Sequence, residues 1–301
     1  MAIRAFNVET ATIKDVVRGN VVPGRMRMQW WKDSLADIFA GDPPPQPVAL
    51  ALSHVVSKQH IAAGEGGGDY RGGLTRRWFD RVVDARMADL DSSQPHTVNE
   101  METYAEYTAS SLLYLSLEIA GVRAWTEGQE GTNAPIVGIN EIGHAASHVG
   151  KATGMCTLLR SIALPKVPQS ALAEGPMDVS FACILPTEVM RKNSLSHGVL
   201  QRGPKTEKEA HALAESVFDV ATVAKGHMDL AVEGLAAASD KRGGQGLPAG
   251  AFAALLPGVR AMWYLEKLEE CQFDAFDETL RPRSPLAFQL RLAKAVWREQ
   301  F

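Results

Sequence analysis

Cysteine is scarce in this sequence. Only Cys156, Cys183 and Cys271 occur among 301 residues, and no CxxC pair is present. Because the number is odd and the spacings are wide, we expect three reduced, mostly buried thiols in a protein of a reducing compartment.

Long apolar runs and an excess of positive charge are also lacking. No stretch of about 18 uninterrupted apolar residues exists, so we expect no membrane-spanning helix. The 31 Lys and Arg residues are outnumbered by 35 Asp and Glu residues, which gives a formal net charge of -4 and a pI near 6.1. This balance excludes the chain-wide basic surface that non-specific nucleic-acid binding needs, and we expect no nucleic-acid partner.

The N-terminus lacks the features of a targeting peptide. Residues 1–15, MAIRAFNVETATIKD, carry acidic residues and have neither a basic n-region nor a cleavage site. The helical pattern is already under way at Met1. We therefore expect the N-terminal helix to be incomplete and an upstream segment to be missing from this sequence.

Helical periodicity runs along nearly the whole chain. In residues 97–121 apolar side chains recur every three to four positions, Thr97 and Glu100 form a capping-box pattern, and Gly121 stands where a C′ residue belongs. The stretch that begins at Thr206 repeats this pattern. We expect further helices near residues 3–18, 25–39, 46–60, 74–89, 139–162, 249–269 and 284–299. A short alternation at 179–184 is the one weak strand signal.

The composition is that of a folded globular protein, with 46% hydrophobic and 22% charged residues. The breaks in periodicity are flexible insertions that are too short to mark a domain boundary, at residues 63–73, 127–138, 163–176 and 239–246. We therefore predict an all-α fold in which residues 1–301 form a single domain.

Motifs for metal or nucleophilic chemistry are weak. Glu141, His144 and His148 share a predicted helix, but a di-iron bundle needs a second ExxH unit and a zincin needs a glutamate inside HxxxH, and both are missing. We expect these histidines to make local hydrogen bonds. The glycine-rich run 64–68 does not match a phosphate-binding loop, and no GxSxG occurs.

Arginine and tryptophan cluster at residues 25–32 and 76–78. Such clusters suit phosphate or membrane headgroups, although buried tryptophans beside solvated charges are the commoner arrangement. The C-terminal stretch SPLAFQLRLAKAVWREQF predicts a basic amphipathic helix. Docking of this helix onto the body of the protein is favoured over a membrane-surface or partner-binding role. One side of it carries Leu286, Leu290, Ala293 and Trp297.

Six segments, taken in order, resemble the squalene/phytoene synthase family of isoprenoid synthases. They are AFNVETATIKD (5–15), MRMQWWKDSL (26–35), WFDRVVDARMADL (78–90), EMETYAEYTASSLLYLSLEIAG (100–121), GKATGMCTLLRSI (150–162) and ILPTEV (184–189). The resemblance covers most of residues 2–199 and is weaker beyond 200. AFNVE, RMQWW and SSLLYL look most similar to a mitochondrial branch known as complex I assembly factors. The resemblance implies a helical isoprenoid-synthase bundle around a central cavity.

The family joins prenyl diphosphates with Mg²⁺, which two Asp-rich motifs hold through carboxylate oxygens. Laid on this chain, the first motif falls on Ala11, Thr12 and Asp15, and the second falls on Ser161 and Pro165. One carboxylate of five remains. Two charges 4 Å apart interact by about 4 kcal/mol at an effective dielectric constant of ~20, so the loss of four acids implies that metal–diphosphate binding is abolished.

Other residues near the motif positions are candidates for phosphate contacts or for substitute acids. Arg27 and Arg160 are candidates for residual phosphate or partner contacts. Glu9 lies about 200° around its helix from the motif, and Asp84 and Asp89 are about 140° apart on theirs. We expect these acids to face solvent and to pair with the neighbouring arginines at 76, 81 and 86. No catalytic residue, metal ligand set or cofactor is predicted.

The resemblance implies a non-catalytic assembly factor for mitochondrial respiratory complex I, on the matrix side of the inner membrane. Complex I subunits or other assembly factors would be its partners, with a peripheral membrane contact and a lipid in the former prenyl cavity. Two alternatives stay open. One is an active squalene/phytoene-type prenyltransferase, which would need Mg²⁺ and at least three carboxylates that converge on one cavity. The other is a non-catalytic isoprenoid- or lipid-binding protein.

Overall fold

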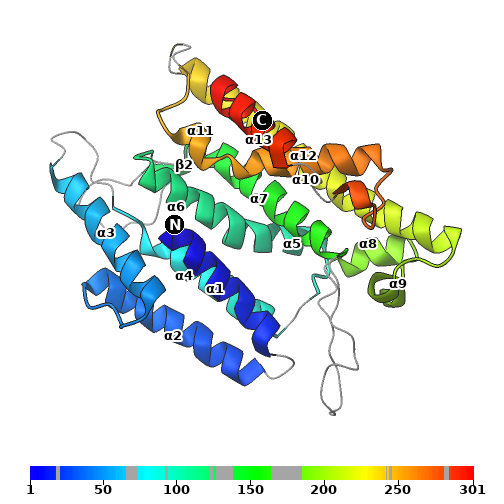
Figure 1. Ribbon diagram of the computed structural model, residues 1–301, viewed down its shortest axis with the longest axis horizontal. Coiled ribbons are helices and arrows are strands. Elements are labelled where there is room, and N and C mark those ends of the chain that lie inside the picture. Colours follow the sequence, from blue (N-terminus) through cyan, green and yellow to red (C-terminus); the bar gives the residue numbers. More distant parts are fainter. Residues whose placement is uncertain are drawn as a thin grey trace.

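The computed structural model describes residues 1–17, 21–65, 73–91, 94–122, 125–126, 138–163, 185–241, 243, 246–280 and 285–301. Helices dominate these ranges, which confirms the predicted all-α class (Figure 1). The central cavity and the single-domain organisation stay predictions.

The N-terminal half contains α1 (Ala2–Val17), α2 (Val21–Ala40), α3 (Pro47–Glu65), α4 (Arg76–Asp89), α5 (Val98–Ala105), the π-helical turn η1 (Glu106–Ser110) and α6 (Ser111–Ile119). Two-residue strands β1 (Trp125–Thr126) and β2 (Gly138–Ile139) then pair antiparallel. The C-terminal half contains α7 (Glu141–Ser161), α8 (Thr187–Lys192), α9 (His197–Arg202), α10 (Glu207–Lys241), α11 (Ala251–Ala254), α12 (Pro257–Glu270), the 3₁₀ turn η3 (Glu278–Leu280) and α13 (Pro285–Arg298).

Local signals place the ends of several helices correctly. The Thr97 hydroxyl accepts a hydrogen bond from the Glu100 amide at 3.1 Å, and the Glu100 carboxylate accepts one from the His96 amide at 2.7 Å. These two bonds satisfy amide groups that the first turn of α5 leaves without an intrahelical partner. Gly121 adopts a φ of 74° at the end of α6, a conformation that favours glycine.

Other expectations need correction. The helix expected near 249–269 is divided into α11 and α12, because Pro257 lacks an N–H and begins a new helix. Helix α10 continues to Lys241 and α3 to Glu65, so both extend into segments expected to be loops. The short helices α8 and α9, the turn η1 and the strand pair carry no periodicity long enough to predict them. The strand signal at 179–184 lies outside the described residues.

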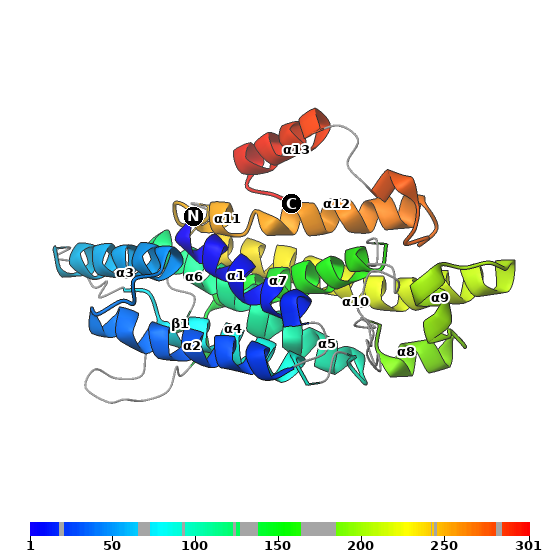
Figure 2. The same cartoon turned by 60° about the horizontal axis from the view of Figure 1, so that its bottom comes forward.

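Helices α7 and α10 run antiparallel through the middle of the protein, as the contact of His148 with His227 and that of Glu141 with Lys241 require. The helices α1 to α4 lie on one side of this pair, and α5, η1 and α6 lie between, with η1 and α6 in contact with both α4 and α7 (Figure 1). Figure 2 shows α12 lying along the other side and α13 lying outside α12. Among the described residues, no helix combines the length and apolar character that crossing a bilayer demands.

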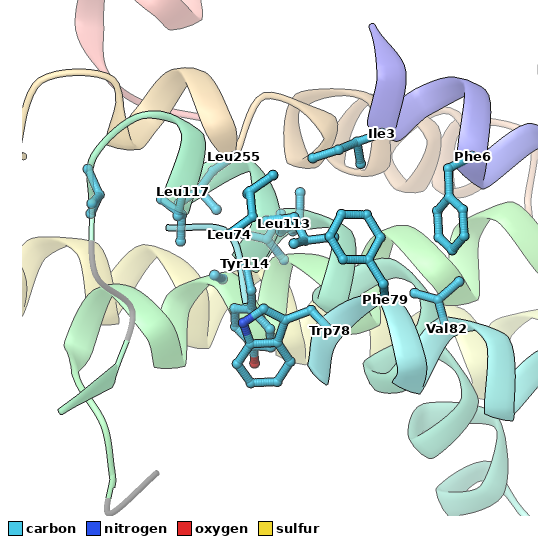
Figure 3. Packing of buried hydrophobic residues seen from close by; sticks show 14 of the residues in the cluster. Ile3, Phe6, Leu74, Trp78, Phe79, Val82, Leu113, Tyr114, Leu117 and Leu255 are labelled. Carbon is cyan, nitrogen blue, oxygen red and sulfur yellow. The ribbon is translucent and has the colours of Figure 1, made fainter. Parts of the chain in front are cut away.

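Aromatic side chains fill the core between α1, α2 and α4. Figure 3 shows Phe6 of α1 and Phe79 of α4 in this core. Phe6 of α1 is fully buried and meets Trp31 edge-on at 5.1 Å between ring centroids and Phe79 at 5.3 Å. Trp78 packs on Tyr114 of α6 at 4.7 Å. Rings that pack edge-on gain stabilisation beyond their area burial, and here they fix the position of α1, the helix that carries the first degraded motif.

Two glycines bring α7 unusually close to α5 and η1. A Cβ atom on Gly150 would collide with the Ser110 backbone, with the Ser110 nitrogen only 2.6 Å away, and a Cβ on Gly154 would lie 2.5 Å from the Ala105 Cβ. Glycine is therefore required at both positions, one helical turn apart, because any side chain would push the helices apart.

We predict that Gly150→Ala lowers the free energy of unfolding by about 1–3 kcal/mol in urea titrations, because the added methyl group overpacks the contact with Ser110. Gly226→Ala on α10 is the matched control. Its Cβ would meet nothing within 4 Å, so the better helix propensity of alanine should stabilise the protein by about 0.5–1 kcal/mol. Equal effects of the two substitutions would contradict the proposed close packing.

Candidate functional site

The first degraded motif lies on the exposed side of α1. Ala11 and Thr12 are both solvent-exposed, and the Thr12 hydroxyl donates to the Val8 carbonyl oxygen of its own helix at 3.0 Å. Asp15 lies in the last turn of the same helix. A methyl group and a hydroxyl already engaged by its own backbone are poor ligands for a divalent cation.

The second degraded motif lies at the end of α7. The Ser161 hydroxyl donates to the Leu158 carbonyl oxygen at 2.7 Å, and Arg160 beside it is partly buried. Arg160 lies close enough to Arg260 for its charge to add to burial in lowering the pKa of Arg260. Pro165 lies outside the described residues. Arg27 is exposed on α2.

These donors do not fit a Mg²⁺–diphosphate site, which needs several carboxylate oxygens. Within the described ranges, no group of three or more His, Cys, Asp or Glu side chains lies close enough together to hold a metal ion.

The inner face of α1 is held by polar side chains of α4. Buried Arg86 donates to the Asn7 carbonyl oxygen at 2.9 Å, to the Asn7 side-chain oxygen at 2.5 Å and to the Thr10 hydroxyl. One turn further along, the Lys14 ammonium meets the Asp89 carboxylate at 2.7 Å. We call this set of Asn7, Thr10, Lys14, Arg86 and Asp89 the α1 clasp.

Tyr104 of α5 extends the clasp, because its hydroxyl is hydrogen-bonded to Arg86. Burial, with the Asp89 charge, raises the pKa of Tyr104 to about 12, so the phenol stays neutral. Burial also raises the pKa of Asp89, and Lys14 opposes that rise. The clasp therefore joins three helices through groups that satisfy one another.

Three acids, Glu9, Asp84 and Asp89, are the candidates to replace the missing motif aspartates, and each has a lysine or side-chain amide partner. Asp84 pairs with Lys32 of α2 at 2.7 Å and Asp89 with Lys14 of α1, so the expected pairing with arginines was wrong. The reason is that these two acids face different neighbouring helices. The Glu9 carboxylate accepts a hydrogen bond from the Gln46 amide at 2.9 Å. The three acids thus have separate partners on different elements.

A second polar cluster surrounds Glu106, the first residue of the π-helical turn. Its carboxylate accepts hydrogen bonds from the Tyr114 hydroxyl at 2.9 Å and the Ser147 hydroxyl at 2.7 Å, and Arg81 lies 3.4 Å away. Burial works against ionisation, but hydrogen bonds from Ser147, Ser110 and Tyr114 outweigh it and lower the pKa of Glu106. The carboxylate therefore stays charged and satisfied.

The two histidines nearest this cluster link helices rather than making local contacts. His148 Nδ1 lies 2.9 Å from His227 Nδ1, and His227 Nε2 lies 3.2 Å from the Glu102 carboxylate. Burial, reinforced by the His227 charge, lowers the pKa of His148 to about 4. The pair is therefore neutral at physiological pH. For His148 the expectation of local hydrogen bonding was wrong, because α10 supplies the partner.

Glu118 of α6 is a buried acid with only neutral donors. It accepts hydrogen bonds from the Thr75 amide at 3.0 Å and from the Trp78 indole at 3.2 Å. Burial raises its pKa to about 7. Sequence reasoning missed Glu106, Glu118 and the clasp, although charged or polar residues at inward positions of an apolar stripe were a signal for them.

The squalene/phytoene synthase family model matches residues 1–288. The chain is 34% identical over 300 residues to "NADH dehydrogenase (ubiquinone) complex I, assembly factor 6" of Bos taurus, and 33% identical to the protein of the same name in Homo sapiens. Each match covers all of this chain and 74% of the relative.

Two solved structures share the fold. A dehydrosqualene synthase in complex with ligand matches with a TM-score of 0.63 and 17% identity, over 99% of this chain and 84% of that one. The squalene synthase HpnC from Alicyclobacillus acidocaldarius matches with a TM-score of 0.61 and 14% identity, over 91% and 82% of the two chains. The expected isoprenoid-synthase fold is thereby confirmed.

We predict that Arg86→Met lowers the free energy of unfolding by about 2 kcal/mol or more, because the buried Thr10 hydroxyl and the partly buried oxygen atoms of Asn7 lose their charged donor. Arg77→Met is the control. Arg77 is exposed on the same helix, and its substitution should change stability by less than about 0.5 kcal/mol. Urea titration measures both, and equal midpoints would show that the clasp contributes nothing.

Glu118 should impose a pH dependence on stability. Its folded pKa of about 7 lies above the ordinary value of 4.5, so between these values the folded state holds a proton that the unfolded state has lost. Stability should therefore fall by about 3 kcal/mol as pH rises from 4.5 to above 7. The difference in stability between wild type and Glu118→Gln, followed against pH, isolates this effect. A difference that does not change with pH would contradict it.

Proposed function

The chain belongs to the squalene/phytoene synthase family, and from this membership we propose that it is a non-catalytic member that acts as an assembly factor for mitochondrial respiratory complex I. The observation that carries the proposal is the replacement of metal-binding acids in both Asp-rich motifs. Ala11, Thr12 and Ser161 present a methyl group and two hydroxyls that bond to their own helices.

The names of the relatives support the assembly role. Relatives from cattle, rat, mouse and human that match the whole chain at 33–34% identity are each named complex I assembly factor 6. Proteins of Dictyostelium discoideum and Drosophila melanogaster, at 27% and 32% identity, are each named as an assembly factor 6 homolog. By contrast, the family enzymes with solved structures are 14–17% identical and support the fold alone.

The proposal places the protein in mitochondria, on the matrix side of the inner membrane, with complex I subunits or other assembly factors as its partners. In this role the protein would need no Mg²⁺ or other cofactor. The satisfied polar clusters support a structural role for the bundle, since Arg86, Asp89 and Glu106 are each engaged by protein partners instead of being left to bind a substrate.

Asp15→Asn tests the non-catalytic character, because Asp15 is the one acid left at the five motif positions. In cells that lack their own assembly factor 6, we expect the wild-type chain and Asp15→Asn to restore complex I to the same level, measured by native gel and NADH oxidation. If restoration of complex I depended on metal-dependent prenyl transfer, Asp15→Asn would remove the last motif carboxylate and restoration would fail. Such a failure, at normal protein abundance, would refute the proposal.

A further inference from the structure

The C-terminal helix α13 docks on α12 through one face. Phe288 meets the Trp263 ring at 5.9 Å, and Arg291 donates two hydrogen bonds to Glu266, one at 2.5 Å and one at 2.7 Å. Ala295 is buried on the same face. Docking of this helix was expected, and the side that docks is the one opposite Leu286, Leu290 and Trp297.

The face of α13 that points away from the protein is apolar. Leu286 is 69% exposed, Leu290 is 72% exposed and Trp297 is 81% exposed, and Ala293 between them is also exposed. These four residues, at i, i+4, i+7 and i+11, form a continuous line on one side of the helix, which we call the outer stripe. Figure 2 shows that α13 stands at the edge of the molecule, outside α12.

Positive charge accompanies the outer stripe. Lys294 and Arg298 are exposed on the same helix. Residues 281–301 contain five basic residues and one acidic residue, a net charge of +4. The remaining 26 basic and 34 acidic residues give the rest of the chain a net charge of -8. The C-terminal segment is thus basic in an otherwise acidic protein, and Lys294 and Arg298 of this segment are exposed beside the outer stripe.

We propose that α13 lies on the surface of a bilayer containing anionic lipids, with the outer stripe among the acyl chains and with Lys294 and Arg298 at the lipid phosphates. A helix with an apolar face, a terminal tryptophan and flanking basic residues is the form that binds in the interfacial plane. Its charge complements anionic headgroups.

A second copy of the chain is a poorer occupant. A pair of stripes would bring together two C-terminal segments that each carry a net charge of +4, and like charges that approach each other oppose association. A bilayer also requires no matching shape, which suits a single helix that stands out from the body of the protein.

This inference rests on the proposed function only for the identity of the membrane in the cell. Purified protein and lipid vesicles test binding of the outer stripe to a bilayer directly. We expect the full chain to float with vesicles of phosphatidylcholine mixed with phosphatidylglycerol, and to bind phosphatidylcholine vesicles about tenfold more weakly. Leu290→Ser with Trp297→Ser should lower binding to the anionic vesicles by about tenfold or more. Lys294→Glu with Arg298→Glu should abolish the preference for anionic lipid.

The matched control is Leu230→Ser with Val232→Ser on α10, two apolar residues that are 48% and 46% exposed. This variant should bind vesicles as the wild type does. Circular dichroism and the melting temperature should match for all variants, because the changed side chains are at the surface. Absence of vesicle binding by the wild type, equal binding to both lipid compositions, or equal loss in the stripe and control variants would each overturn the proposal. Restoration of complex I in cells is a separate readout that none of these outcomes decides.

Discussion

Helix α7 lies against α5 and the turn η1 at a separation that only glycine permits, and much of the interior depends on this contact. Gly150 and Gly154 remove the side chains that would hold the helices apart. The close approach brings Ser147 within hydrogen-bond distance of Glu106, while the opposite contact of α7 places His148 beside His227 of α10. A buried polar group destabilises the folded protein unless it is hydrogen-bonded. The close packing of the backbone supplies the hydrogen-bond partners of these clusters.

The helix on which the family resemblance places the first Asp-rich motif is stabilised here by the protein itself. The inner face of α1 is fixed by Arg86 and Asp89, and its outer positions Ala11 and Thr12 offer no anionic oxygen. An assembly factor needs a stable surface for its partners rather than a reactive cavity. Retaining the helical frame while replacing its ligands is consistent with that role, and the exposed apolar line on α13 adds a surface on which such a frame can be positioned.

Sequence patterns predicted the long helices well because their periodicity and caps are local properties. Thr97 and Gly121 mark their helix ends as expected. The partners of charged residues were predicted poorly, because they depend on which helices become neighbours. Asp89 pairs with Lys14, 75 residues away, and His148 contacts His227, 79 residues away. The docked face of α13 could not be predicted either, since both of its faces carry apolar residues and only tertiary packing selects the docked one.

Calorimetric titration of the purified full chain with a non-hydrolysable prenyl diphosphate analogue, with and without Mg²⁺, tests the central claim most directly. Four of five motif acids are replaced, so the account predicts no Mg²⁺-dependent binding at any analogue concentration up to the millimolar range. A saturable, Mg²⁺-dependent heat with micromolar affinity would show that acids from elsewhere in the chain rebuild the metal site, and it would contradict the account.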